Sequence, residues 1–187
     1  MHALFFEVWP KPGHLANYFA HVERLKPALV RHAGLWFLDR YQALDDPDLL
    51  LSHQHWADDA AIAAWRQDRT HRRSQEAGRR VHFRDYRLRV GAEALRGTSA
   101  EAERLMPGGD RLLVTIHAAA VADLPGARGF ESVNRPGALL TLAEAGSEEE
   151  ARGRLAEAGA TPGLTAAHAF AISRDYGMLR RDEAPQL

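Results

Sequence analysis

The tripeptide Arg-Asp-Tyr occurs twice in the chain, at 84–86 and at 174–176, and the two copies are 90 residues apart. Each copy falls at the same place in what reads as the last strand of a half-chain. At 187 residues the chain has room for two small domains. We interpret the repeat as the mark of a duplication, with a first unit at 1–90, a linker at 91–110 and a second unit at 111–187.

The first unit shows the element order β-α-β-β-α-β. Apolar residues after Gly13 recur at spacings of three and four, which predicts a helix with one buried face. Asp58 can cap a second helix that Gly78 ends. The predicted elements are a strand at 3–9, a helix from 15 to Gly34 bent or divided at Pro27, strands at 36–44 and 49–56, a helix at 58–78 and a strand at 82–90. This order is typical of a ferredoxin-like unit, in which two helices cover one face of a four-stranded antiparallel sheet.

The second unit repeats this order without its first helix. Only ten residues separate Ala119 from Phe130, too few for a crossover helix. The predicted elements are strands at 112–119, 130–134 and 138–144, a helix at 147–158 and a strand at 167–179. The predicted fold class is therefore α+β, with two ferredoxin-like units packed sheet to sheet as a barrel.

Composition excludes several classes of function. A formal net charge of -1 gives no general electrostatic attraction to nucleic acid or anionic membranes, and acidic residues interrupt the six arginines between 66 and 80. The absence of cysteine removes disulfides and thiolate chemistry. No run approaches the roughly 18 apolar residues of a membrane span, and the N-terminal apolar stretch is too short for a secretory signal, so we expect a cytoplasmic protein.

A set of residues in the first unit is typical of one known domain: Pro12-Gly13, the strand ending in Trp56, an acidic helix cap, Ala64-Trp65-Arg66, His71, Gln75, Gly78-Arg79 and Asp85-Tyr86. Through these residues the first unit resembles the antibiotic biosynthesis monooxygenase domain, a member of the dimeric α/β-barrel superfamily. The resemblance covers about residues 3–90, and the second unit resembles the same domain only through its hairpin, helix and last strand. The chain is therefore similar to a tandem form with one degenerate copy.

The resemblance implies a barrel of two sheets, formed between subunits or between tandem halves, with a ligand cavity between each sheet and its helices. A homodimer is compatible with it. It does not imply one reaction, because members resembling this domain include cofactor-free oxygenases of polyketide anthrones, haem-degrading enzymes and small-molecule isomerases.

A cofactor-free oxygenase needs a base that forms a substrate anion, donors that hold the resulting oxyanion, and an aromatic cavity that excludes water. The second predicted helix supplies such groups. We expect Trp65 to line the cavity, His71 to act as the base, and Arg66 and Tyr86 to position the substrate. The expected function is a cofactor-independent monooxygenase that combines molecular oxygen with a small aromatic or polyketide-type substrate.

The first alternative function is haem binding or degradation, and the second is non-catalytic binding of a small molecule. In haem-degrading members of the resembled group, activity depends on an Asn in the first strand, a Trp in the second helix and a His ten residues later. Here Phe6 or Glu7 stands at the Asn position, Gln75 stands ten residues after Trp65, and His71 is four residues too early. We therefore expect no cofactor, with haem as the alternative.

A metal site has weaker candidates. His53 and His55 are two residues apart, so in a strand both side chains project from the same face. With His82 or His117 as a third ligand, the pair would suit zinc, iron or copper. No spacing of a known metal motif is present, so our expectation is no metal, with His53 and His55 as the candidates if one binds.

Overall fold

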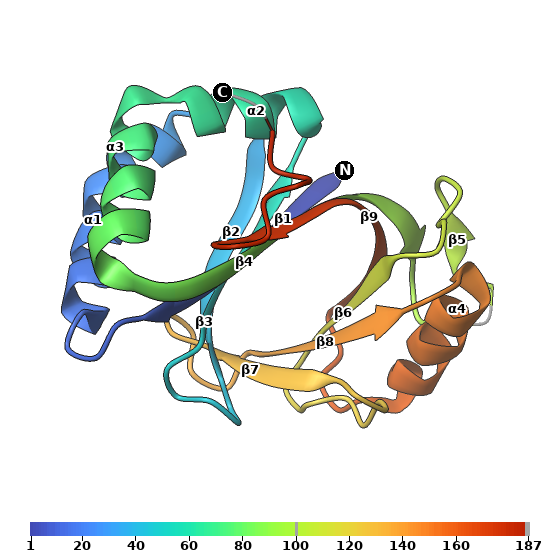
Figure 1. Ribbon diagram of the computed structural model, residues 1–187. Helices are drawn as coiled ribbons and strands as arrows, with labels where there is room; N and C mark the ends of the chain where they lie inside the picture. The colour runs from blue at the N-terminus through green and yellow to red at the C-terminus, as the bar shows by residue number, and fades with distance from the viewer. Residues whose placement is uncertain (100, 186–187) are drawn as a thin grey trace.

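The computed structural model describes residues 1–99 and 101–185, and within these residues nine strands form one antiparallel sheet (Figure 1). The strands are β1 (His2–Pro10), β2 (Leu35–Ala43), β3 (Leu50–Trp56), β4 (Phe83–Arg96), β5 (Glu103–Arg104), β6 (Leu112–Ala118), β7 (Arg128–Ser132), β8 (Leu139–Ala145) and β9 (Ala166–Gly177). Their order is β1-β3-β2-β7-β8-β6-β9-β4-β5, and β4 also pairs with β1. The sheet therefore closes into a barrel, from which the short β5 projects.

The two halves of the chain contribute the same strand order to this barrel. The first half runs β4-β1-β3-β2 and the second runs β9-β6-β8-β7. Hydrogen-bonded ladders join β2 to β7 and β4 to β9, so the halves meet edge to edge as well as face to face. The predicted α+β fold of two ferredoxin-like units in a barrel is confirmed. Because the circle closes within one chain, a second copy is not needed to complete it.

Helices cover the outer faces of the barrel (Figure 1). The first half carries α1 (Leu15–Val30), α2 (Asp59–Gln67), α3 (Arg69–Ala77) and a π-helical turn at Gly78–His82, and the second carries α4 (Glu148–Glu157) with a 3-10 turn at Ala158–Ala160. As the ten-residue gap predicted, no helix lies between β6 and β7 in the described chain. None of the described helices has the length and apolar character needed to cross a membrane.

Side-chain alternation along each strand divides the molecule into an interior and two outer layers. On β3, Ser52 and Gln54 face α1 and α2, whereas His53 faces the barrel interior. Phe5, Tyr41, Phe130, Leu140 and Phe170 pack in that interior. A separate apolar cluster lies between the first sheet and its helices, and a third lies beneath α4.

The prediction of one helix at 58–78 is wrong, because the helix divides at Asp68. Asp68 has an extended backbone (ψ 131°), and its Oδ1 accepts a hydrogen bond from the backbone N–H of His71 at 2.9 Å. An Asp side chain that caps a new helix competes with continuation of the old one. Asp58 caps α2 as predicted, with Oδ1 2.8 Å from the N of Ala61.

Two further boundaries differ from expectation. Pro27 lies inside α1 without dividing it, and the helix ends at Val30, before Gly34. The strand predicted at 82–90 continues to Arg96, because its later residues pair with β9 and β5. The division of the chain into units at 1–90 and 111–187, joined by the linker at 91–110, stays a prediction.

Candidate functional site

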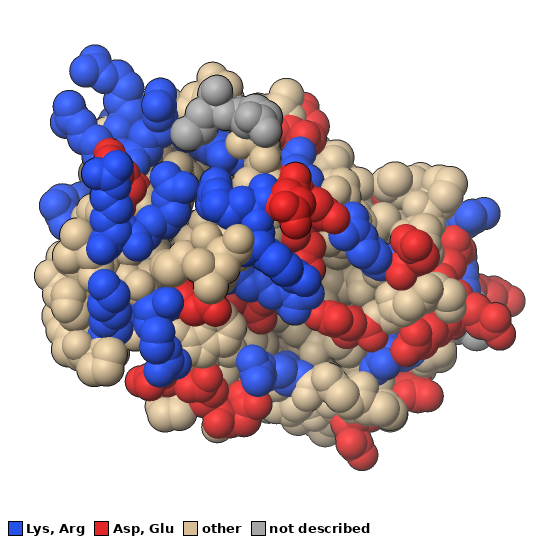
Figure 2. Space-filling view, in the orientation of Figure 1, with Lys and Arg blue, Asp and Glu red and all other residues tan. Residues whose placement is uncertain are grey.

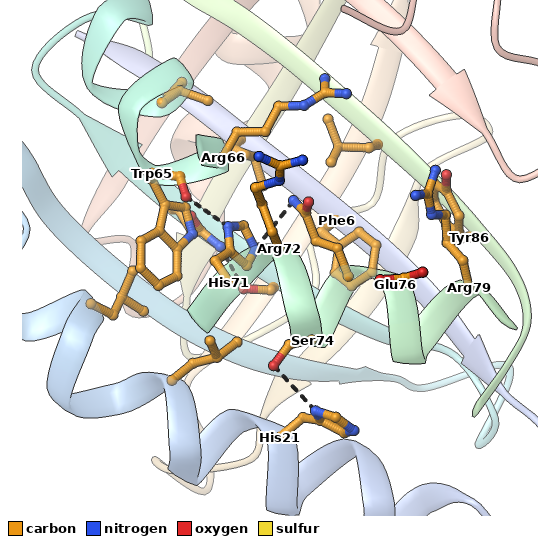
Figure 3. A pocket seen from close by; sticks show the side chains of 18 of the residues that line it. Phe6, His21, Trp65, Arg66, His71, Arg72, Ser74, Glu76, Arg79 and Tyr86 are labelled. Carbon is orange, nitrogen blue, oxygen red and sulfur yellow. Dashed lines mark hydrogen bonds between the residues drawn. The ribbon is translucent and has the colours of Figure 1, made fainter. Parts of the chain in front are cut away.

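A cavity of about 910 Å³ lies between α1, α2 and α3 and the outer face of the first sheet (Figure 3). This volume suits a small organic ligand, because such sites typically measure about 300–1,000 Å³. Its walls are mostly apolar. They include Leu4 and Phe6 of β1, Leu25 and Leu29 of α1, Ile62 and Trp65 of α2, and Leu88 and Val90 of β4.

Trp65 and His71 form a stacked pair on the helical wall of this cavity. Trp65 is 3% exposed, and its ring lies 4.2 Å from that of His71 at an interplanar angle of 15°. The Nδ1 of His71 lies 2.9 Å from the carbonyl oxygen of Trp65 (Figure 3). A carbonyl can only accept, so Nδ1 donates and the neutral ring keeps Nε2 as an acceptor. Gln75 Nε2 lies 3.4 Å from that nitrogen.

Burial lowers the pKa of His71 to about 4, although the Trp65 carbonyl and the Asp68 carboxylate favour the charged form. The imidazole is therefore neutral at pH 7 and able to accept a proton. A pKa this low makes it a weak base toward water. An anion formed beside the ring would raise that pKa, because an opposite charge at close range stabilises the imidazolium.

Arg66 and Tyr86 also line the cavity, but each has a partner that the sequence did not indicate. Arg66 donates from Nη2 to the carbonyl oxygen of Pro185 at 3.0 Å, and its Nη1 lies 3.4 Å from the hydroxyl of Tyr176. Arg181 Nη1 donates to the Tyr86 hydroxyl at 2.6 Å. Because Tyr86 accepts this bond, its own hydroxyl hydrogen is free to donate. The segment after β9 thus completes one wall.

The two tyrosines of the repeated tripeptide both line this cavity, from the neighbouring strands β4 and β9. Arg174 also lines the cavity and pairs with α2, where its Nη1 donates to Asp59 Oδ2 at 2.9 Å. Burial is the main cause that raises the pKa of Tyr176. The repeat could have indicated Tyr176 as a cavity residue, whereas Arg181 lies outside every motif.

A short chain of polar groups crosses the floor of the cavity on β3. Trp56 Nε1 donates to Gln54 Oε1, and Gln54 Nε2 donates to the Ser52 hydroxyl, each at 3.0 Å. Ser52 is 4% exposed and Gln54 8%. Since Ser52 accepts from Gln54, its hydroxyl hydrogen is free to donate to a bound ligand. Sequence reasoning missed both residues, because the candidate ligands His53 and His55, which alternate with them along β3, lie on the other face.

Basic side chains surround the mouth of the cavity. Figure 2 shows Lys and Arg gathered over the end of the molecule that carries α3. Arg69, Arg72, Arg73 and Arg79 are exposed and line the cavity. They create a positive field that attracts anionic ligands.

The candidate metal ligands lie on the opposite face of the first sheet from this cavity. His117 of β6 joins His53 and His55 inside the barrel, so that one nitrogen of each lies within 4.8 Å of the others. His82, the other suggested third ligand, lies elsewhere, with its Nδ1 3.0 Å from that of His14. It is the last residue of the π-helical turn and does not belong to the group formed with the pair on β3.

Comparison with known proteins places the chain in a family. A family model described as antibiotic biosynthesis monooxygenase matches residues 1–77. The jasmonate monooxygenase ABM of Pyricularia oryzae is 30% identical over 209 residues, covering 100% of this chain and 97% of that protein.

Two solved structures share lower similarity. A candidate antibiotic biosynthesis monooxygenase from Nitrosomonas europaea is 12% identical, covers 49% of this chain and 97% of its own, and has a TM-score of 0.45. A candidate monooxygenase from Lactobacillus acidophilus is 6% identical, covers 91% and 92%, and has a TM-score of 0.47. The family assignment rests on the relative aligned along the whole chain: this protein belongs to the antibiotic biosynthesis monooxygenase family.

Proposed function

We propose that this protein is a cofactor-independent monooxygenase that oxidises a small aromatic or polyketide-type substrate in the cavity beneath α1, α2 and α3. The observation that carries the proposal is the stacked Trp65–His71 pair, which presents a neutral imidazole acceptor in a largely apolar cavity. Family membership supports a monooxygenase-like function but leaves the substrate open.

In this proposal His71 Nε2 takes a proton from an acidic CH₂ or phenol group of the substrate. The resulting oxyanion is held by donors whose hydrogens are free, namely the hydroxyls of Ser52 and Tyr86, with Arg66 as the nearby positive charge. Trp65 packs against the imidazole and limits its motion. These groups stabilise charge where it develops, which is the main contribution expected from a site without covalent chemistry.

The overall reaction balances without an external reductant when the substrate is an anthrone-type CH₂ compound. The carbanion adds to O₂ and gives a substrate peroxide, which takes back the proton that His71 received. Loss of the remaining C–H proton then breaks the O–O bond and releases water, leaving a carbonyl. The CH₂ group gives up four electrons, and O₂ accepts four, one oxygen entering the product and the other the water.

A jasmonate-like anion is a second candidate substrate. Jasmonate is the substrate that the name of the Pyricularia oryzae relative gives, and the arginines at the cavity mouth suit a negatively charged molecule. Insertion of one oxygen atom into a C–H bond takes only two electrons from the substrate, so the reduction of O₂ needs two more electrons from an external reductant. Oxygen uptake with jasmonate only after addition of a reductant would therefore favour this second candidate.

The residues present do not fit haem as in haem-degrading members. Gln75 occupies the position of the expected histidine, and the His71 ring is stacked on Trp65 with Nδ1 engaged by the Trp65 carbonyl. We expect no Soret band when the protein is titrated with haemin. A stoichiometric band that is lost in His71→Asn would refute the cofactor-independent proposal.

Oxygen uptake with an anthrone-type phenol tests the proposed base. His71→Asn keeps a donor for the Trp65 carbonyl but removes Nε2, so we expect kcat to fall by about 10²–10⁴, the usual contribution of a general base. His14→Asn is the matched control, because His14 lies outside the cavity lining, and it should keep wild-type kcat. Equal rates in wild type and His71→Asn would exclude His71 as the base.

A further inference from the structure

We propose that His53, His55 and His117 bind a divalent transition-metal ion of the zinc and copper class inside the barrel. This site is separate from the cavity beneath the helices, because it lies on the opposite face of β3. The proposal does not depend on the proposed oxygenase activity.

The barrel brings the three ligands together from two strands of different halves. His53 and His55 project inward from β3, and His117 projects inward from β6. The Nε2 atoms of His53 and His55 are 3.0 Å apart, and one nitrogen of each of the three lies within 4.8 Å of the others. Metal–nitrogen bonds of 2.0–2.1 Å in a tetrahedral site separate two ligand nitrogens by about 3.4 Å. Small rotations of the rings therefore suffice to close the triangle.

Two of these imidazoles carry buried nitrogens without a partner in the described structure. His53 Nδ1 and His117 Nε2 make no hydrogen bond, and the same holds for the Thr115 and Tyr41 hydroxyls on neighbouring positions of the interior. Buried polar side-chain atoms usually have partners, so each exception calls for an explanation. A metal ion held by His117 Nε2 would supply one, and a water on the ion could serve the hydroxyls.

Aromatic side chains pack against the three rings, and the Phe37 ring lies 5.8 Å from that of His117. Phe5 stacks on His53 with centroids 4.6 Å apart, and Phe37 lies 4.9 Å from His55. His53 is fully buried, whereas His55 and His117 are partly exposed, which leaves a route for an ion to enter. Ligands fixed by packing lose little freedom when they bind a metal.

The surrounding charges are compatible with a cation. The ring of His168 packs against that of His55, and its Nδ1 is 2.8 Å from Glu93 Oε1. Hydrogen bonds from Arg96 and His168 lower the pKa of Glu93 to about 2 despite burial, so this carboxylate is ionised.

The donor set determines the class of metal. Three imidazoles without thiolate suit Zn²⁺, Cu²⁺, Ni²⁺ or Co²⁺, whereas Mg²⁺ and Ca²⁺ prefer oxygen ligands. Among these ions a nitrogen site binds Cu²⁺ most tightly and Zn²⁺ strongly. With three protein ligands, a fourth position stays open to water or to a small ligand.

Titration of chelator-treated full-length protein with Zn²⁺, followed by calorimetry, tests this site. We expect one ion per chain and a higher Tm when Zn²⁺ is present. The affinity for Zn²⁺ should fall by more than about 100-fold in His117→Gln and in His55→Gln, because losing only a hydrogen-bond partner of a metal ligand already costs about 10–100-fold. The matched control is His82→Gln, because His14 and His82 form another pair of imidazole nitrogens 3.0 Å apart. Its affinity should equal that of wild type.

Electron paramagnetic resonance of the wild-type protein with one equivalent of Cu²⁺ keeps the proposal falsifiable if either variant fails to fold. Hyperfine coupling to three imidazole nitrogens would support the site. The proposal would be overturned by coupling to fewer than three imidazole nitrogens, by an unchanged Zn²⁺ affinity in folded His117→Gln, or by loss of Zn²⁺ binding in His82→Gln.

Discussion

Replacing Asp68 with Ala should release His71 from its position on Trp65. Asp68 Oδ1 accepts from the backbone N of His71 at 2.9 Å and caps α3, a nine-residue helix without a buried residue. A side-chain contact to α1 also holds α3, because His21 Nδ1 lies 3.2 Å from the Ser74 hydroxyl. Loss of an N-cap costs about 1 kcal/mol, within a range of about 0.5–2 kcal/mol. With so little packing, we expect the cost to show as fraying of the first turn of α3.

Two substitutions separate capping from charge. Asp68→Asn keeps an acceptor at the cap, so its free energy of unfolding should stay within about 0.5 kcal/mol of wild type. It removes the negative charge that favours the imidazolium, so the His71 pKa should stay at or below about 4. In Asp68→Ala the frayed turn exposes the ring, and the pKa should rise toward about 6.5, the value of a solvated histidine.

Urea unfolding and an NMR titration of the His71 ring measure these two effects. Asp58→Ala is the matched control, because Asp58 caps α2 through the N of Ala61 at 2.8 Å. It should lose a similar free energy of unfolding and leave the His71 pKa near 4. If Asp68→Ala lowers the His71 pKa as Asp68→Asn does, then the cap does not position His71 and the reasoning fails.

Three further predictions concern the barrel and its helices. Asp39→Ala should lower the free energy of unfolding by about 3 kcal/mol in urea, because this buried carboxylate accepts from Ser132, Asn134 and Arg135 across the β2–β7 seam; wild-type stability would contradict it. Gly78→Ala should lower the free energy of unfolding by about 1–3 kcal/mol and lower Tm with it, since a Cβ there would lie 2.3 Å from the Phe83 ring; an unchanged Tm would argue against this packing. Stability should be greatest above pH 6.5 and fall as the pH drops toward 4, because buried imidazoles with lowered pKa values, including those of His55 and His117, protonate only on unfolding; urea midpoints that do not decrease from pH 7 to pH 5 would refute this.

Much of the fold could be predicted from local pattern. The first unit has complete apolar stripes and strong turn and cap residues, so its strands and helices were placed within a few residues. The division at Asp68 could not be seen, because the same residue can lie inside a helix or cap one, and packing of His71 on Trp65 decides between these states. The extension of β4 depends on partners from β9 that are distant in sequence.

The site was only partly accessible to sequence reasoning. Trp65, Arg66, His71 and Tyr86 were expected in one cavity, and all four line it. Ser52, Gln54 and Arg181 were missed, because the role of a polar side chain in a site depends on hydrogen-bond partners that the sequence does not show. The convergence of His117 with His53 and His55 depends on barrel closure, which joins two halves that sequence spacing cannot orient.

The central claim is that His71 deprotonates a substrate bound in the cavity beneath α1, α2 and α3. Absorption spectra of an anthrone-type phenol bound without oxygen test it most directly, because the substrate anion then accumulates and can be seen. We predict the spectrum of the anion with wild-type protein and of the neutral compound with His71→Asn, at equal occupancy of the site. Anion bands of equal intensity in both proteins would contradict the claim.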